Sequence, residues 1–290
     1  MKLKIFKKGF NFSQDGPGNR LVLHLQGCNM RCAWCSNPEG LDPRGALIVD
    51  GKMAHEALCP HGALKDGRRD EARCESCDRV CVAPENRNAG IRLSCEEIDS
   101  EELVALAMDA KALFFGGGGV TLSGGEPMSQ FEAVAELLEN LRGKGINTAM
   151  ETNGTSPRLD EFFPLIDHLM LDHKVPDAEK HKRLTGVEAD IVRGNIQIAG
   201  AKHPDLIIRT PLIRGVNDSD EDREDFLRFY DSCVFINTAF EFLPYFDYGK
   251  VKWEKCGMEY RMHEDAHVSA DTLGAYIRRF REKGYRVVKT

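Results

Sequence analysis

Short apolar segments of strand length alternate with longer amphipathic segments along most of this chain, and this alternation limits the folds that it can adopt. Apolar runs that predict strands lie at 21–26, 120–123, 146–151, 168–172, 206–213, 239–245 and 285–289. Helical periodicity lies at 101–114, 130–142, 159–167, 177–184, 189–201, 220–231 and 270–283. Repeated strand–helix units form parallel sheets whose strands are connected by helices. We therefore expect an α/β fold with a mostly parallel sheet.

The first expected strand leads directly into a loop that holds three closely spaced cysteines. The loop reads GCNMRCAWCSNP and places Cys28, Cys32 and Cys35 in a C-x3-C-x2-C pattern. Three thiolates on one short loop can bind three corners of a metal cluster, whereas an iron–sulfur cubane normally takes one cysteine for each of its four irons. Because the loop offers no fourth cysteine or histidine, one iron would stay open for another ligand. A zinc knuckle is the alternative, and it would need that fourth ligand at close range.

The cysteine content points to metal or redox chemistry. The chain contains ten cysteines, and its basic start, MKLKIFKKGF, lacks the apolar core of a signal peptide. In the reducing cytoplasm such cysteines serve metals or redox reactions rather than disulfides. The longest apolar runs are too short to cross a membrane, and the formal net charge of -7 disfavours a nucleic-acid surface. We therefore expect a cytoplasmic iron–sulfur protein with no membrane or nucleic-acid partner.

Residues 51–99 differ in composition from the rest of the chain. Glycine, proline and charged residues dominate there, apolar periodicity is lost, and five of the ten cysteines lie in this range. A segment with so little apolar material would not fold readily without a bound metal. We therefore divide the chain into a core formed by residues 1–50 and 100–290 and a cluster-binding insert at 51–99.

The cysteine pattern of the insert is similar to that of ferredoxins. A close run, Cys74-x2-Cys77-x3-Cys81, is accompanied by Cys59, which precedes a proline as the remote ligand of a ferredoxin cluster does. The three-residue second gap departs from the usual ferredoxin spacing. We expect one auxiliary [4Fe–4S] cluster with four thiolate ligands: Cys59, Cys74, Cys77 and Cys81. Cys95 is the alternative fourth ligand, and zinc is the alternative metal.

Residues suited to ligand binding follow the ends of three further expected strands. A GGEP turn at 124–127 follows the second strand, and Glu151 and Thr152 end the third. Asp172 and Lys174 lie at the end of the fourth. The carboxyl ends of barrel-like parallel strands meet at one rim, so these residues should lie near one another. Alone, the turn would be a surface loop and the Asp172–Lys174 pair a strand-end salt bridge.

Together, the cysteine loop and the GGEP turn resemble motifs of the radical S-adenosylmethionine (radical SAM) enzymes. The resemblance includes Trp34, an aromatic residue directly before the last cysteine. It implies a [4Fe–4S] cluster on Cys28, Cys32 and Cys35, with the amino and carboxylate groups of S-adenosylmethionine (SAM) on the open iron. The implied fold is a partial (β/α)6 TIM-like barrel, here with an inserted small ferredoxin-like domain.

Other strings resemble a subgroup, the glycyl-radical-enzyme activating enzymes of the pyruvate formate-lyase activating enzyme type. These strings are DGPG-x-R at 15–20, GGGGVTLSGGEP at 116–127 and the cysteine-rich insert. The resemblance implies an anaerobic oxidoreductase that cleaves SAM reductively. The resulting 5′-deoxyadenosyl radical would remove a hydrogen atom from a glycine Cα of a partner enzyme. The implied partners are that glycyl radical enzyme and a flavodoxin or ferredoxin electron donor, and we expect a monomer.

The same resemblance assigns roles to individual residues around the expected site. Residues implied to bind SAM or a nearby monovalent cation are Trp34, Asn37, Gly124, Gly125, Glu126, Glu151, Thr152, Asp172, Lys174 and Arg209. The Met170 carbonyl would complete the cation site, and Asp15 and Gly16 would contact the protein substrate. One departure is Phe246, which stands where the family's Leu-Pro-Tyr-His string has a histidine. Stacking by Phe246 or a polar contact from Asp247 could replace that histidine.

Other functions remain open from the sequence. A radical SAM enzyme that acts on a small molecule, or an activator of anaerobic ribonucleotide reductase, would share the core motifs. The ferredoxin-like insert and the GGGGVTLSGGEP string favour the activation of a glycyl radical enzyme over both. A pure electron carrier would not need the GGEP turn or the Asp172–Lys174 pair.

Overall fold

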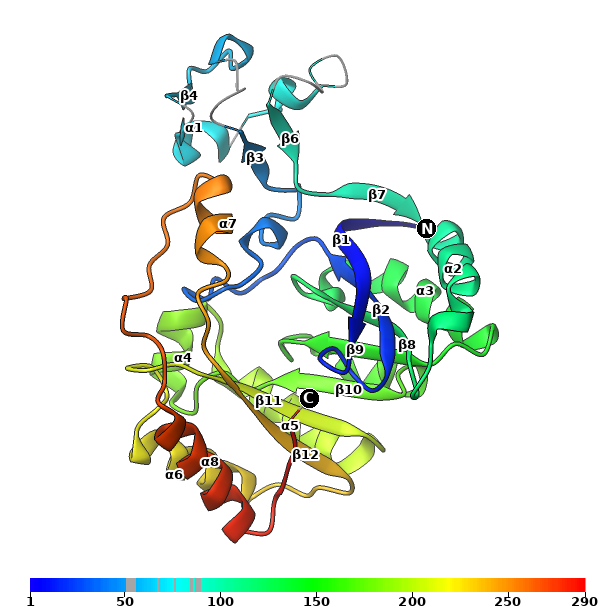
Figure 1. Cartoon of the computed structure of the whole chain (residues 1–290), viewed down its shortest axis with the longest axis vertical. Coiled ribbons are helices and arrows are strands. Elements are labelled where there is room, and N and C mark those ends of the chain that lie inside the picture. The colour runs from blue at the N-terminus through cyan, green and yellow to red at the C-terminus, as the bar shows by residue number, and fades with distance from the viewer. Residues whose placement is uncertain (51–55, 67, 76, 84–85, 87–89, 290) are drawn as a thin grey trace.

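One large sheet organises the chain, and a computed structural model describes residues 1–50, 56–66, 68–75, 77–83, 86 and 90–289. The nine strands of the sheet are β1 (Lys2–Phe12), β2 (Asn19–Leu25), β7 (Glu96–Asp99), β8 (Gly119–Gly124), β9 (Thr148–Thr152), β10 (His168–Asp172), β11 (Leu206–Leu212), β12 (Thr238–Pro244) and β13 (Arg286–Val287). Their order is β13-β12-β11-β10-β9-β8-β2-β1-β7 (Figure 1). Every neighbouring pair from β13 to β2 is parallel. The predicted α/β fold with a mostly parallel sheet is therefore confirmed.

Amphipathic helices connect and flank these strands. They are α2 (Ser100–Asp109), α3 (Phe131–Gly143), α4 (Ala178–Thr185), α5 (Ala189–Lys202), α6 (Asp220–Tyr230), α7 (Lys250–Lys255) and α8 (Ala270–Glu282). The apolar face expected for α3 is buried through Val134, Leu137, Leu138 and Leu141. Residues 159–167, expected as an α-helix, contain instead the 3-10 helix η7 (Leu159–Leu165), in which Pro164 lacks the N–H donor of a helical turn. Within the described residues, no helix combines the length and apolarity that a membrane span requires.

Strand β1 was not expected from the sequence. It pairs antiparallel with β2 on one side and with β7 on the other, so it extends the parallel sheet at this edge. Leu3 and Ile5 of β1 are buried, whereas Lys7 and Lys8 are exposed. The lysines and the glycine of this segment obscure its alternating pattern, which explains why it was missed.

The cysteine-rich segment packs as a small unit at one end of the molecule, next to α7 (Figure 1). Its elements are β3 (Leu47–Val49), η2 (Glu56–Leu58), β4 (Leu64–Lys65), β5 (Arg68–Arg69), α1 (Glu71–Glu75), η3 (Val80–Val82) and β6 (Ile91–Leu93). Strand β3 pairs with β6 and β4 with β5. A second, separate core is formed there by Leu47, Ala63, Leu64, Cys74, Cys81 and Ile91. Strand β7 lies within the range 51–99 but belongs to the main sheet.

Candidate active site

The carboxyl ends of the parallel strands surround an open cavity. Its lining combines the cysteine loop after β2 with residues at or near the ends of β8, β9, β10, β11 and β12. The predicted site residues in this lining are Cys28, Cys32, Trp34, Cys35, Asn37, Gly124, Gly125, Glu151, Thr152, Asp172, Lys174 and Arg209. Glu126, Asp15 and Gly16 lie outside it. The structure thus brings most of the predicted residues to one cavity, and their binding roles stay predictions.

The three cysteines after β2 are free thiols that line this cavity. Burial raises the pKa of Cys28 and Cys32 to about 12 and that of Cys35 to about 11. Such thiols stay protonated at neutral pH unless a metal stabilises their thiolates. Three thiols around one open cavity, with Cys32 buried and Cys28 and Cys35 half-buried, therefore fit a cubane that keeps one iron for a further ligand.

The turn at Gly124 and Gly125 packs directly against the cysteine loop. The Gly125 N–H donates to the Leu25 carbonyl at 2.8 Å, and the Glu126 N–H donates to the Gly27 carbonyl at 2.7 Å. Gly124 has a φ of +109°, which disfavours other residues. A Cβ on Gly125 would overlap the Gly27 carbonyl oxygen. The two turns can approach this closely because both positions are glycine.

Glu126 is buried beneath this turn and does not face the cavity. Its carboxylate accepts hydrogen bonds from the Thr152 hydroxyl and the Asn153 N–H, both at 2.7 Å. The Met128 N–H donates to it at 3.1 Å. Burial raises the pKa of Glu126 to about 7. Its side chain thus connects the GGEP turn to the end of β9, in contrast to the cofactor contact expected from the sequence.

Charged side chains of both signs form one wall of the cavity. The Lys174 Nζ lies 2.5 Å from Asp172 Oδ2, and Arg209 pairs with Glu151. The Arg209 Nε donates to Glu241 Oε2 at 2.8 Å. Burial raises the pKa of Glu151 to about 7, although the charge of Arg209 opposes this shift. A wall with both charges suits a zwitterionic ligand.

Glu241 and Asn153 are functional candidates that sequence reasoning missed. Glu241 is 1% exposed on β12 and holds Arg209 from outside the cavity lining. A carboxylate in the apolar string TAFEFLP was the available signal, because a buried charge requires a partner. Asn153 lines the cavity, and its Nδ2 lies 3.7 Å from Cys28 Sγ.

Asp15 and Gly16 belong to the DGPG loop, which lies beside the charged wall. The Gln14 carbonyl accepts a hydrogen bond from Arg209 Nη2 at 2.5 Å. The Thr121 hydroxyl donates to the Asp15 carbonyl at 2.7 Å. The loop is therefore attached to a residue of the cavity, although its own predicted binding residues lie outside the lining.

Phe246 does not take the place of the family histidine at the cavity. Its ring stacks on Tyr248, with centroids 5.1 Å apart and an interplanar angle of 9°, and the residue is 51% exposed. Leu243, earlier in the same segment, lines the cavity instead. Neither Phe246 nor Asp247 belongs to the cavity lining.

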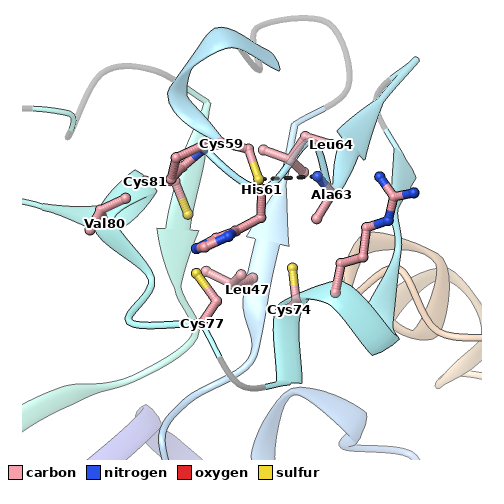
Figure 2. Close-up of a pocket in the computed structure, with 11 residues that line it drawn as sticks. Leu47, Cys59, His61, Ala63, Leu64, Cys74, Cys77, Val80 and Cys81 are labelled. Carbon is pink, nitrogen blue, oxygen red and sulfur yellow. Dashed lines mark hydrogen bonds between the residues drawn. The ribbon is translucent and has the colours of Figure 1, made fainter.

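A second pocket lies in the cysteine-rich unit and is lined by all four predicted ligands: Cys59, Cys74, Cys77 and Cys81. Figure 2 shows the thiols of Cys74, Cys77 and Cys81 turned toward a common space, with the His61 side chain between them in this view. His61 is exposed, so its side chain can turn outward. The Ala63 N–H donates to Cys59 Sγ and the Arg79 N–H to Cys77 Sγ, both at 3.2 Å. Backbone hydrogen bonds of this kind stabilise cluster-bound thiolates.

Cys95, the alternative fourth ligand, does not line this second pocket. It lies beside Gly45, where an added Cβ would be 2.8 Å from Cys95 Sγ. Within the described ranges, no three His, Cys, Asp or Glu side chains converge tightly enough to hold a single metal ion. A cubane instead spreads its four irons over separate corners, so its thiolates surround a larger space. The donor set of the second pocket fits that arrangement with Cys59 as the fourth ligand.

Comparison with known proteins defines the family. The model of the radical SAM superfamily matches residues 22–230. An indoleacetate decarboxylase activating enzyme from Tractidigestivibacter scatoligenes is 30% identical over 283 residues, which cover 90% of this chain and 89% of that protein. An isethionate sulfite-lyase activating enzyme from Desulfovibrio desulfuricans is 32% identical over 278 residues, which cover 90% and 88%. The chain belongs to the radical SAM superfamily and, within it, to the glycyl radical enzyme activating enzymes.

A solved structure shows the same fold at lower sequence similarity. A radical SAM methyltransferase from Sphaerobacter thermophilus superimposes with a TM-score of 0.55 and 15% identity, covering 96% of this chain and 67% of that protein. The parallel sheet is therefore shared with a radical SAM enzyme of different activity.

Proposed function

We propose that this chain reductively cleaves SAM and uses the 5′-deoxyadenosyl radical to generate a glycyl radical on a partner enzyme. One observation favours this function over that of a pure electron carrier. Three thiols, a glycine turn and a wall with both charges line the same cavity. An electron carrier would need the thiols but not the other two features.

Each wall of the cavity suits a different part of SAM. The cluster on Cys28, Cys32 and Cys35, when bound, supplies the electron for reductive cleavage. The backbone at Gly124 and Gly125 can approach the methionyl amino group, because these residues have no side chains. Lys174 can pair with the SAM carboxylate. Trp34, Asn37 and Thr152 complete the proposed cofactor contacts.

A monovalent cation beside SAM is part of this proposal. Its ligands would be Glu151, Thr152, Asp172 and the Met170 carbonyl, from the neighbouring strands β9 and β10. Burial raises the pKa of Glu151 to about 7, so a nearby cation would favour its ionised form.

The cysteine-rich unit is proposed to bind one auxiliary [4Fe–4S] cluster in a ferredoxin-like domain. Its own small core and the pocket with four thiols support this assignment. Strands β3 and β6 pair with each other, so the proposed domain begins at β3, just before residue 51, and ends at β6, before β7. The parallel strands β2 and β8 to β12 support a partial (β/α)6 barrel as the core.

Reductive SAM cleavage is the direct test of the core function. Anaerobically reconstituted protein, reduced with dithionite and supplied with SAM, should release 5′-deoxyadenosine and methionine. The variant Cys32→Ala should release neither, because the cluster would lose one of its three ligands. Cys233→Ala is the matched control, since Cys233 is a free thiol outside both pockets and should keep full activity. An absence of 5′-deoxyadenosine from the wild-type protein would contradict the proposal.

Iron content tests the auxiliary cluster independently of activity. The double variant Cys74→Ala/Cys77→Ala should lower the iron from about eight to about four atoms per chain if both clusters are cubanes. The EPR signal of the remaining reduced cluster should still change on addition of SAM. An unchanged iron content would exclude these two ligands.

The partner enzyme and the electron donor also belong to the proposal. Two relatives activate enzymes of different chemistry, a decarboxylase and a sulfite-lyase, so sequence identity does not select the partner. We expect a glycyl radical enzyme as protein substrate, a flavodoxin or ferredoxin as electron donor, and a monomeric activating enzyme. A glycyl radical EPR signal on a candidate partner, formed only with SAM and reductant, would identify the partner.

A further inference from the structure

Helix α7 packs against the segment that directly follows Cys35, the last cysteine of the cysteine loop. Gly249 precedes the helix, and a Cβ there would lie 2.6 Å from the Cys35 carbonyl oxygen. The Trp253 Nε1–H donates to the same carbonyl at 2.8 Å. On its other side, the Cys256 carbonyl after α7 accepts a hydrogen bond from Arg69 of the cysteine-rich unit at 2.7 Å. The helix therefore connects the cysteine loop to the cysteine-rich unit.

Lys252 of α7 directs its ammonium group entirely at the segment after Cys35. Its Nζ lies 2.8 Å from the Ser36 carbonyl, 2.8 Å from Asn37 Oδ1 and 3.1 Å from Glu39 Oε1. A lysine ammonium has three N–H donors and no acceptor. These three contacts therefore use its full donor capacity, and every partner must present an oxygen.

This donor-only chemistry fixes the orientation of the Asn37 amide. An asparagine side chain can normally turn over and exchange its oxygen with its nitrogen. Lys252 excludes the exchanged state, because an amide N–H2 cannot accept a hydrogen bond. Asn37 lines the cavity, whereas Lys252 does not. Among the described residues, no acceptor is found for Asn37 Nδ2, so this donor stays available to a ligand in the cavity.

We infer that Lys252 is a positioning residue for SAM binding, which acts by holding Asn37 with its Nδ2 donor available to an acceptor atom of SAM. The inference rests on the proposed function, because SAM is the ligand of the cavity. It adds a residue 215 positions from Asn37 in the chain, on a helix outside the cysteine, glycine and charged motifs.

The variant Lys252→Met tests the role by removing the donors while keeping an unbranched side chain. The KM for SAM in 5′-deoxyadenosine formation should rise roughly three- to tenfold, which corresponds to one weakened hydrogen bond. The kcat at saturating SAM should change less than about twofold, since Lys252 touches no reacting atom. The SAM concentration that half-completes the EPR change of the reduced cluster should rise by the same factor as KM. Lys255→Met is the matched control, an exposed lysine one turn along α7, and should behave as wild type.

Two further variants separate positioning from general support of the loop. Lys252→Arg should recover most of the SAM affinity, because arginine also offers donors only. Lys252→Gln should not recover it, since a glutamine amide can accept as well as donate and allows Asn37 to turn over. If Lys252→Met does not bind iron normally, the comparison of Arg with Gln still tests the role.

A double-mutant cycle tests whether Lys252 acts through Asn37. Asn37→Ala should raise the KM for SAM, and adding Lys252→Met to it should raise KM little further. Additive effects would overturn the inference, as would a wild-type KM and EPR response in Lys252→Met with normal iron content. Failure of the proposed function has a different signature, because wild-type protein would then release no 5′-deoxyadenosine.

Discussion

Gly125 illustrates how a single residue controls the distance between two functional turns. The turn after β8 hydrogen-bonds to the end of β2 and to the start of the cysteine loop through the Gly125 and Glu126 N–H groups. No side chain fits between Gly125 and the Gly27 carbonyl. The glycine is therefore needed for the packing of the two turns as well as for the approach of a ligand.

Gly125→Ala should lower both stability and SAM affinity. The added methyl group has only backbone to push against, so we expect a loss of about 2 kcal/mol or more in the free energy of unfolding. Gly143→Ala is the control, because a Cβ at this position near the end of α3 would meet no heavy atom within 4 Å beyond its chain neighbours and the backbone of its own helix. It should be neutral or stabilising by up to about 1 kcal/mol. Denaturant unfolding of both variants checks the difference, and equal stabilities would contradict the steric account.

At the scale of elements, the cysteine-rich unit places its cysteines in or next to helical turns that are too short to be stable alone. Cys74 lies in the one-turn helix α1 and Cys81 in the 3-10 helix η3, while Cys59 follows η2. Burial raises the pKa of Cys81, and the neighbouring thiols Cys59, Cys77 and Cys74 raise it further. Because isolated turns of helix are unstable in water, cluster binding should contribute folding free energy to this unit.

The position of Cys59 leads to a matched pair of variants. Cys59→Ser should lower the iron content toward about four atoms per chain and increase proteolytic cleavage within 51–99, because the auxiliary cluster would lose a ligand. Cys95→Ser should keep about eight atoms per chain, since Cys95 lies beside Gly45 and outside the second pocket. Iron loss in Cys95→Ser with normal iron in Cys59→Ser would reverse the assignment.

For the whole molecule, several buried or half-buried histidines couple stability to pH. Burial is the largest cause of a lowered pKa in His24, His173, His181 and His203. Their unfolded forms take up a proton below a pKa of about 6.5, whereas the folded forms resist it, so acid favours unfolding. Glu126 and Glu151 act in the opposite direction, because their folded forms, with pKa values of about 7, bind protons more readily than unfolded glutamate. The net dependence is a balance of these two sets.

His203 allows one contribution to be isolated. Its Nε2 lies 3.1 Å from the Ile166 carbonyl, and its Nδ1 accepts from the Asp205 N–H at 3.2 Å, so the ring is bound in its neutral form. A decrease from pH 7 to pH 5 should destabilise wild type more than His203→Gln, by at most about 2 kcal/mol. Denaturant unfolding at both pH values measures this difference, and any effect of acid on a bound cluster is common to both proteins. An equal loss of stability in the two proteins would contradict it.

Local patterns in the sequence determined the fold class and most of the cavity. Strand and helix periods are repeated every few residues, and the cysteine loop and the GGEP turn are each contiguous, so both can be recognised without knowledge of distant contacts. The common placement of strand ends in a parallel sheet then predicted that Cys28, Gly124, Glu151 and Asp172 lie around one cavity, as the structure places them.

Only the tertiary structure decided the contacts that support these residues. Lys252 reaches Asn37 and Trp253 reaches Cys35 across more than 200 positions of the chain. Glu241 on β12 supports Arg209 on the adjacent strand β11. Glu126 is turned toward the end of β9. Such pairings depend on how helices and strands pack, and a local pattern reports only neighbours within a few residues. The sequence alone therefore identified many of the residues that line the cavity, and the packing of α7 and β12 decided which others hold them in place.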